Sequence, residues 1–176
     1  CIRDRHNTNN VHDNISITGG ILDIDGGEVR VGDESDEDAD LTISSGEVNI
    51  SGGTLNIVDE FDIDGGTFTI SGGTVWVAKT TSTGDGTNVD KFSVAASGTV
   101  NLNGGDLKIG GQSTSSYDAI DIHASSTFSS SSSNTITFDQ QGSTEENFYV
   151  EFNGKTVASN IILNSSGRTL YIDDAT

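Results

Sequence analysis

The feature that most constrains this chain is a short repeat, in which a small polar residue and one or two glycines precede an apolar-x-apolar triplet. The repeat occurs at residues 18–24, 25–31, 45–50, 51–57, 64–70, 71–77, 97–102 and 103–109. Side chains that alternate with a period of two between glycine turns indicate short β-strands. No stretch of the sequence has a helical period, so the sequence predicts an all-β fold.

The strands fall into groups of three. Each group begins with a strand that has no glycine pair before it, at residues 15–17, 41–43, 61–63, 92–94, 120–122 and 148–150. The segments between groups differ in length, whereas the rest of each group is nearly constant at about 17 to 19 residues. These variable segments are residues 32–40, 58–60, 78–91, 110–119 and 139–147.

A constant core with all length variation at one corner is typical of a three-sided parallel β-solenoid, or β-helix. We therefore expect about six rungs, with the long loops at one corner. The 22 glycines and the absence of proline fit this fold, because glycine makes sharp corners and proline would remove a donor from a strand ladder. A β-sandwich or jelly roll is the alternative all-β fold, but it does not predict the constant length.

The repeat also suggests a division of the chain. Residues 1–14 do not match it and are expected to be a non-repeat start or cap, and residues 15–176 form the solenoid segment. The serine-rich stretch 125–133 is either a relaxed rung or a short linker, which leaves a possible weak joint near 125–134. The pattern breaks off within residues 170–176. We therefore expect a segment of a longer solenoid, or ends that dock on other segments of the same chain or on like subunits end to end.

The charge of the chain excludes some classes of partner. With 27 acidic and 8 basic residues, the net charge is −19. So acidic a surface repels phosphate backbones, which argues against nucleic-acid binding. No apolar run approaches the roughly 18 residues of a membrane helix, so membrane insertion is not expected.

An acidic segment, residues 33–40, carries the candidate metal ligands. Asp36, Asp38 and Asp40 alternate along the chain, and this spacing of carboxylate oxygens suits Ca²⁺. Asp59, Glu60 and Asp62 fall at the same corner one rung later. The alternative is a solvated loop without an ion, because charge runs usually lie on a solvated face. Calcium is therefore the candidate cofactor, and the sequence indicates no other.

A second candidate site lies on the outward positions of the third strands. Trp76, the single tryptophan of the chain, is expected to point away from the core, in a column with Arg30 and Lys108. This arrangement is suited to binding a surface glycan, or a protein of the host or substratum. The alternative is a single exposed aromatic residue without a binding role, which is common on protein surfaces. Aspartate and glutamate are so abundant that their proximity does not indicate catalysis, so no catalytic residues and no enzyme are predicted.

The runs Ser-Gly-Gly-Thr-Leu-Asn-Ile (residues 51–57) and Asp-Gly-Gly-Thr-Phe-Thr-Ile (residues 64–70), with the segment 148–174, carry a family resemblance. They resemble the repetitive β-helical segments of very large Bacteroidota cell-surface proteins, which are commonly exported by type IX secretion. The resemblance implies an adhesin, a surface filament or a stalk that displays other domains, and it carries over no catalytic residues.

We therefore expect a non-enzymatic, extracellular, structural or adhesive β-helix segment of a large surface or filament protein. The alternative is a β-helix that binds carbohydrate or cleaves polysaccharide.

Overall fold

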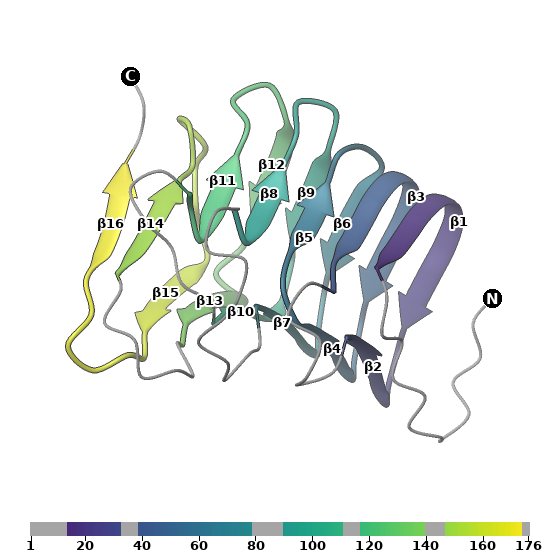
Figure 1. The fold of residues 1–176 in the computed structure, drawn as a ribbon, viewed down its shortest axis with the longest axis horizontal. Coiled ribbons are helices and arrows are strands. Elements are labelled where there is room, and N and C mark those ends of the chain that lie inside the picture. The colour runs from purple at the N-terminus through teal and green to yellow at the C-terminus, as the bar shows by residue number, and fades with distance from the viewer. Residues whose placement is uncertain (1–13, 33–38, 79–89, 111–116, 140–146, 174–176) are drawn as a thin grey trace.

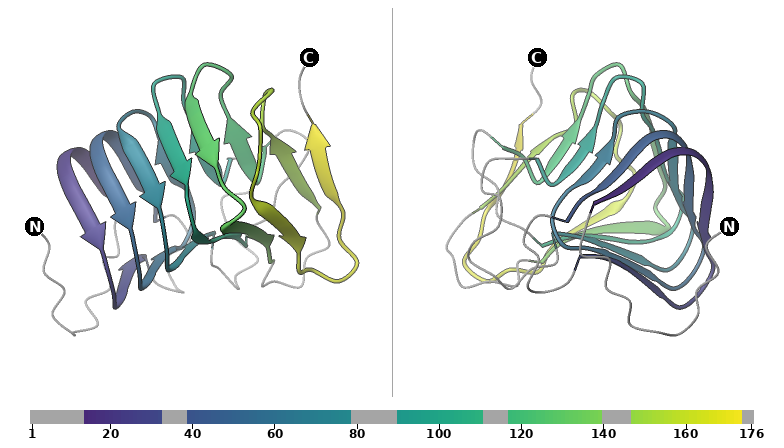
Figure 2. Two further views of the ribbon diagram at one scale, coloured as in Figure 1. Left: turned by 180° about the vertical axis from the view of Figure 1, so that it is seen from behind. Right: turned by 45° about the vertical axis from the view of Figure 1, so that its right-hand side comes forward.

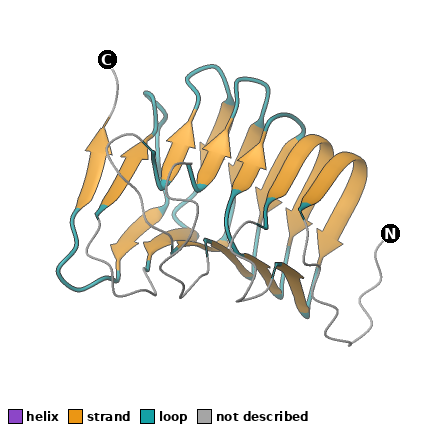
Figure 3. Ribbon diagram, in the orientation of Figure 1, coloured by secondary structure: helices purple, strands orange, loops and turns teal. Residues whose placement is uncertain are grey.

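The computed structural model describes residues 14–32, 39–78, 90–110, 117–139 and 147–173, and their regular structure is entirely β-strand (Figure 3). The sixteen strands are β1 (Ile15–Ile24), β2 (Glu28–Val31), β3 (Leu41–Ile50), β4 (Thr54–Ile57), β5 (Phe61–Ile63), β6 (Thr67–Ile70), β7 (Thr74–Val77), β8 (Phe92–Val94), β9 (Thr99–Leu102), β10 (Gly105–Ile109), β11 (Ile120–Ile122), β12 (Thr127–Ser130), β13 (Asn134–Phe138), β14 (Phe148–Glu151), β15 (Asn160–Leu163) and β16 (Leu170–Asp173).

The strands pair in parallel and form two curled sheets, in which strand order advances along the long axis of the molecule (Figures 1 and 2). One sheet has six strands, in the order β15-β13-β10-β7-β4-β2. The other has ten, in the order β12-β9-β6-β3-β5-β8-β11-β14-β16, with β1 paired to β3. The expected all-β fold with parallel strands is therefore confirmed.

The long strand β3 joins the two arms of the ten-stranded sheet. Its first half, from Leu41 to Ile43, pairs with β5, and its second half, from Glu47 to Ile50, pairs with β6. The β5 arm is the part of this sheet that contains β5, β8, β11, β14 and β16. A repeat is defined as the stretch of chain from the start of one strand of this arm to the start of the next, with the first halves of β1 and β3 counted in the arm. Repeats begin at β1, β3, β5, β8, β11 and β14, which are the positions that the sequence predicts.

The sequence predicts a break between strands near residues 18–20 and 45–46, and there the structure differs. Single strands, β1 and β3, run through both places. In β1 the pairing register shifts on either side of Thr18, which absorbs the extra residues, and in β3 Gly46 has φ of 90°. An irregularity within a strand thus replaces a turn.

Glycine is required at the corner before the six-stranded sheet. Gly53 and Gly73 have φ of 69° and 72°, a region that side chains disfavour. A Cβ on Gly73 would also lie 2.6 Å from the carbonyl oxygen of Gly53 in the preceding repeat. Later in the same column the buried side chain of Asn134 donates hydrogen bonds of 3.0 Å to the carbonyl oxygens of Gly104 and Gly105.

The core lies between the sheets and consists of the alternate, inward side chains of the strands. Leu55, Ile57, Val75 and Val77, on neighbouring strands of the six-stranded sheet, are fully buried. On the other sheet, the rings of Phe61, Phe68 and Phe92 pack edge to face with centroids 4.9 to 6.1 Å apart. This is favourable geometry for aromatic rings.

Serine side chains at three places tie neighbouring repeats together. The hydroxyls of Ser45, Ser97 and Ser131 donate to the carbonyl oxygens of Thr18, Asp64 and Asn103, at 2.5 to 2.8 Å. The bonds of Ser97 and Ser131 satisfy carbonyl groups at corners between strands, and the bond of Ser45 satisfies one at the register shift in β1.

Most of the variation in repeat length falls in one kind of connection. The segments that change most in length join a strand of the six-stranded sheet to the next strand of the β5 arm. The expected loops there include residues 33–38, 79–89, 111–116 and 140–146, which lie outside the described residues, as do 1–13 of the expected cap. The possible joint near 125–134 falls on β12 and the start of β13, which pair in regular register with β9 and β10.

Candidate functional site

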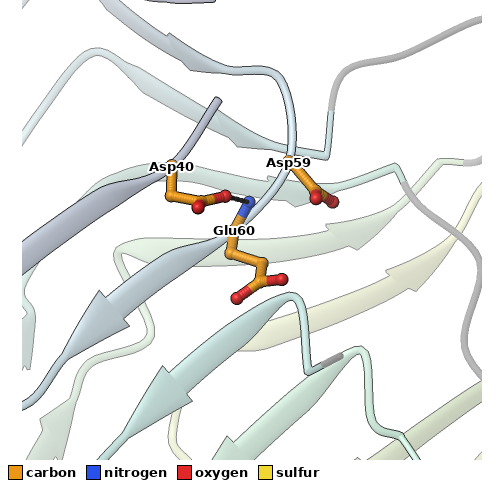
Figure 4. Close-up of side chains that lie close together, drawn as sticks. All are labelled: Asp40, Asp59 and Glu60. Atoms are coloured by element: carbon orange, nitrogen blue, oxygen red, sulfur yellow. Dashed lines mark hydrogen bonds between the residues drawn. The ribbon is translucent and has the colours of Figure 1, made fainter. Parts of the chain in front are cut away.

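The predicted calcium ligands fall only partly within the described residues. Asp36 and Asp38 lie outside them. Asp40 lies immediately before β3, where oxygens of its carboxylate and of the carboxylates of Asp59 and Glu60 are within 4.8 Å of one another (Figure 4). Such a group of oxygens could ligate a hard cation. The sequence places Asp59 and Glu60 at this corner, and the structure brings them to Asp40.

Asp40 also has a structural role. One oxygen of its carboxylate accepts the backbone N–H of Glu60 at 3.2 Å (Figure 4), and its own N–H donates to the side-chain oxygen of Asn14 at 2.9 Å. Further along the same corner, Asp90 accepts from the N–H of Asp118 at 2.7 Å. Side-chain oxygens at this corner thus satisfy backbone donors of the following repeat.

A lysine supplies positive charge beside the cluster. Lys91 Nζ lies 2.6 Å from Asp59 Oδ1, and the side chains are 0% and 5% exposed. Asp59 lies two residues before β5 and Lys91 directly before β8, so the pair links consecutive repeats. An ion pair so deeply buried has an unfavourable desolvation free energy, which the attraction between the two charges must offset. The sequence did not reveal this pair.

Several carboxyl groups on this side of the molecule are easier to protonate than usual. Burial, together with the nearby charges of Asp40, Asp59 and Asp62, raises the pKa of Glu60 to about 7. Burial and the charge of Glu151 do the same for Asp118, whose pKa is also about 7. Because burial disfavours the charged form and like charges add to this, the neutral form is stabilised.

The acidic side chains continue as a column on the outer surface of the β5 arm. Asp121, Glu151 and Asp173 occupy paired positions on β11, β14 and β16. Burial is also the main cause of a raised pKa at Asp62 and Asp121, and Ser93, paired with both, donates a hydrogen bond of 2.5 Å to Asp62. These carboxyl groups therefore line one surface of the sheet with acidic side chains.

The structure brings together two of the three residues of the predicted binding patch. Trp76 and Lys108 pair across β7 and β10, and Lys108 Nζ lies 5.0 Å from the centre of the indole ring, within the range of a cation–π interaction. Arg30 is two strands away from Trp76, on the far side of Asn56. Its Nε lies 3.4 Å from Glu28 Oε1. Trp76 itself is half-buried.

The two ends of the stack expose apolar surface, which the patterns of individual strands did not predict. At one end an open apolar cleft is lined by β1 and Val29. At the other, Ile162 on β15 is 47% exposed and Ile172 on β16 is 53% exposed. Beside Ile172, Tyr171 stacks on Tyr149 with ring centroids 4.8 Å apart. These side chains are exposed because, within the described residues, the outermost strands have a neighbouring strand on one side only.

Comparisons with protein-family models, with curated proteins and with solved structures found no match. In the part of the chain that the structure describes, no helix is long and apolar enough to cross a membrane.

Proposed function

We propose that this chain is a three-sided parallel β-solenoid segment with a non-enzymatic, structural or adhesive role in a large extracellular surface or filament protein. The observation that carries the proposal is the in-register stacking of repeats along one axis. The two arms that meet at β3 supply two sides of the solenoid, and the six-stranded sheet supplies the third. Continuous backbone ladders and apolar columns would make such a stack a stiff spacer.

The proposal includes an end-to-end contact with a second copy of this chain. The outer edges of β15 and β16 would pair with β2 and β1 of the next copy, because every repeat continues the same parallel ladder. Charge favours this order: the segment 153–173 carries Lys155 and Arg168 against Asp173, whereas 14–32 carries Asp23, Asp25 and Glu28 against Arg30. A head-to-tail contact of this kind propagates into open filaments.

Sedimentation velocity over a range of protein concentrations tests this contact. We expect the wild type to form extended, concentration-dependent oligomers, and Ile172→Lys to remain monomeric because a charge would be buried at the contact. Thr69→Lys, at an outward position in the middle of the stack, is the matched control and should assemble like the wild type. A wild type that stays monomeric at all concentrations would rule out the self-contact and favour further repeats of a longer chain as the occupant.

Carbohydrate binding is the second candidate function, and the observation that favours it is the Trp76–Lys108 pair. An aromatic face beside a cation suits an acidic sugar. A glycan array with the wild type and Trp76→Ala tests this function. Binding that the variant loses would support it, and an array without specific binding would contradict it. Release of sugar from acidic polysaccharides would instead identify a polysaccharide-cleaving enzyme.

A further inference from the structure

Lys91 and Asp59 are positioned for a covalent reaction. Their reacting groups are in contact, with Nζ and Oδ1 2.6 Å apart, and both side chains are almost completely removed from solvent. The backbone on either side is fixed by neighbouring repeats, since the N–H of Lys91 donates to the carbonyl of Asp118 and the N–H of Asp59 to that of Ala39. An amine and a carboxyl group held together in this way react as if at very high concentration.

We propose that Lys91 Nζ and Asp59 Cγ condense to form an amide bond, which cross-links consecutive repeats. A proton first passes from the ammonium group to the aspartate, which leaves a neutral amine and a carboxylic acid. The Nζ–Cγ bond then forms and one Cγ–O bond breaks. The oxygen leaves as water with the proton of the acid and one proton of the amine, and the amide nitrogen keeps the other amine proton. The reaction needs no oxidant, reductant or other reagent.

The buried setting favours this product. In water, an ammonium and a carboxylate are well solvated and do not condense, whereas in the protein interior the separated charges are disfavoured. The amide is neutral, and the water that it releases can leave for the solvent. The reaction thus removes a buried ion pair and replaces it with one polar group.

Glu60 is placed to carry protons during the reaction. Its carboxylate lies within 4.8 Å of that of Asp59. In its neutral form it can donate to the departing oxygen, and in its charged form it can accept a proton from the attacking nitrogen. Glu60 is therefore a candidate acid–base group for the cross-link, and the bond itself depends on Lys91 and Asp59 alone.

The cross-link does not depend on the proposed extracellular role, and mass spectrometry of the purified, folded chain tests it directly. We expect the intact mass to be lower than the sequence mass by one molecule of water. Because aspartate before glycine, as at Asp25 and Asp64, can also lose water by cyclising, tandem spectra of a proteolytic digest must show a branched peptide that joins Lys91 to Asp59. A folded wild type without that peptide overturns the proposal.

Variants test whether Lys91 and Asp59 are the two residues that form the bond. Lys91→Arg should remove the branched peptide, and Lys108→Arg, the matched control at an outward lysine, should retain it. In Asp59→Asn the leaving group becomes ammonia, so the product should have the same mass as the cross-linked wild type. Circular dichroism confirms that each variant is folded. A branched peptide that persists in folded Lys91→Arg would contradict the assignment.

Glu60→Gln tests the proton carrier, because it leaves both partners in place. The starting sample is made by cell-free synthesis and denatured at once, so that it is not cross-linked. After refolding, we expect the cross-link to form more slowly in this variant than in the wild type. An unchanged rate would show that Glu60 does not take part.

Discussion

The middle of the stack and its C-terminal end share the same parallel pairing of strands but differ in burial. In the middle, the inward side chains of β5, β6 and β8 are fully buried, and three phenylalanine rings pack together. At the end, all four side chains of β15 are exposed, as are three of the four on β16. The alternation of side chains sets which way they point, and the neighbouring repeat decides whether they are buried. Stability should therefore vary along the chain, although the parallel pairing of the strands continues to its C-terminal end.

The largest expected effect compares a core ring with an end residue. Phe68→Ala should lower the free energy of unfolding by about 3 to 5 kcal/mol, because it leaves a cavity among packed aromatic rings. Ile161→Ala, on the exposed β15, should lower it by much less. Urea denaturation followed by circular dichroism measures both. Equal losses would mean that the C-terminal strands are as well covered as the middle ones.

The next effect compares two glycines that have similar backbone angles. Gly73 and Gly154 have φ of 72° and 76°, but a Cβ would clash with backbone at Gly73 and meet nothing within 4 Å at Gly154. Gly154→Ala should cost about 1 kcal/mol, from the positive φ alone. Gly73→Ala should cost roughly 3 kcal/mol, because neighbouring repeats must also move apart. Thermal unfolding measures the difference, and similar melting temperatures would show that the corner can widen freely.

Carboxyl groups in both regions should make stability depend on pH. The pKa values of Glu60 in the middle and Asp118 nearer the end are raised to about 7. The unfolded chain binds these protons less tightly than the folded one. The two groups therefore contribute fully to stability below the pKa that they have in the unfolded chain, and this contribution is lost as pH rises through about 7. We expect a higher melting temperature at pH 5 than at pH 8.

Glu60→Gln and Asp118→Asn should each weaken this dependence, and the double variant should weaken it further. A melting temperature that rises with pH over the same range in the wild type would contradict the expectation.

The smallest effect concerns the exposed ring at the end of the stack. Tyr171→Leu keeps an apolar side chain but removes the stacking on Tyr149, which should cost about 0.5 to 1.5 kcal/mol. Tyr117→Leu is a comparison at another partly exposed tyrosine, one for which no ring stacking is described. Urea denaturation of both variants measures the contribution of the stacked pair, and equal losses would show that stacking adds nothing.

Much of the fold could be predicted from the sequence because it depends on local pattern. The alternation at Leu55 and Ile57 identifies a strand, and the nearly constant repeat length brings that strand beside the next one. The continuous strands β1 and β3 could not be predicted, because the same glycine pattern makes a turn in one place and an irregular strand in another.

The candidate sites depend less on local pattern. Trp76 and Lys108 were predicted to lie together, because they occupy the same position in successive repeats. The pairing of Lys91 with Asp59 was missed because Lys91 follows a segment of variable length, where the repeat does not fix the register. Nothing in the alternation indicates that a lysine at this corner is buried.

The direction of the backbone hydrogen bonds has a mechanical consequence. They run between parallel strands along the axis of the stack, and β1 and β16 lie at its opposite ends (Figure 1). A pull along the axis therefore opens these bonds lengthwise instead of shearing them, and only one repeat needs to open at a time. Under tension the poorly covered C-terminal repeat should peel away first, and the chain should lengthen in successive small steps before the buried phenylalanine cluster opens.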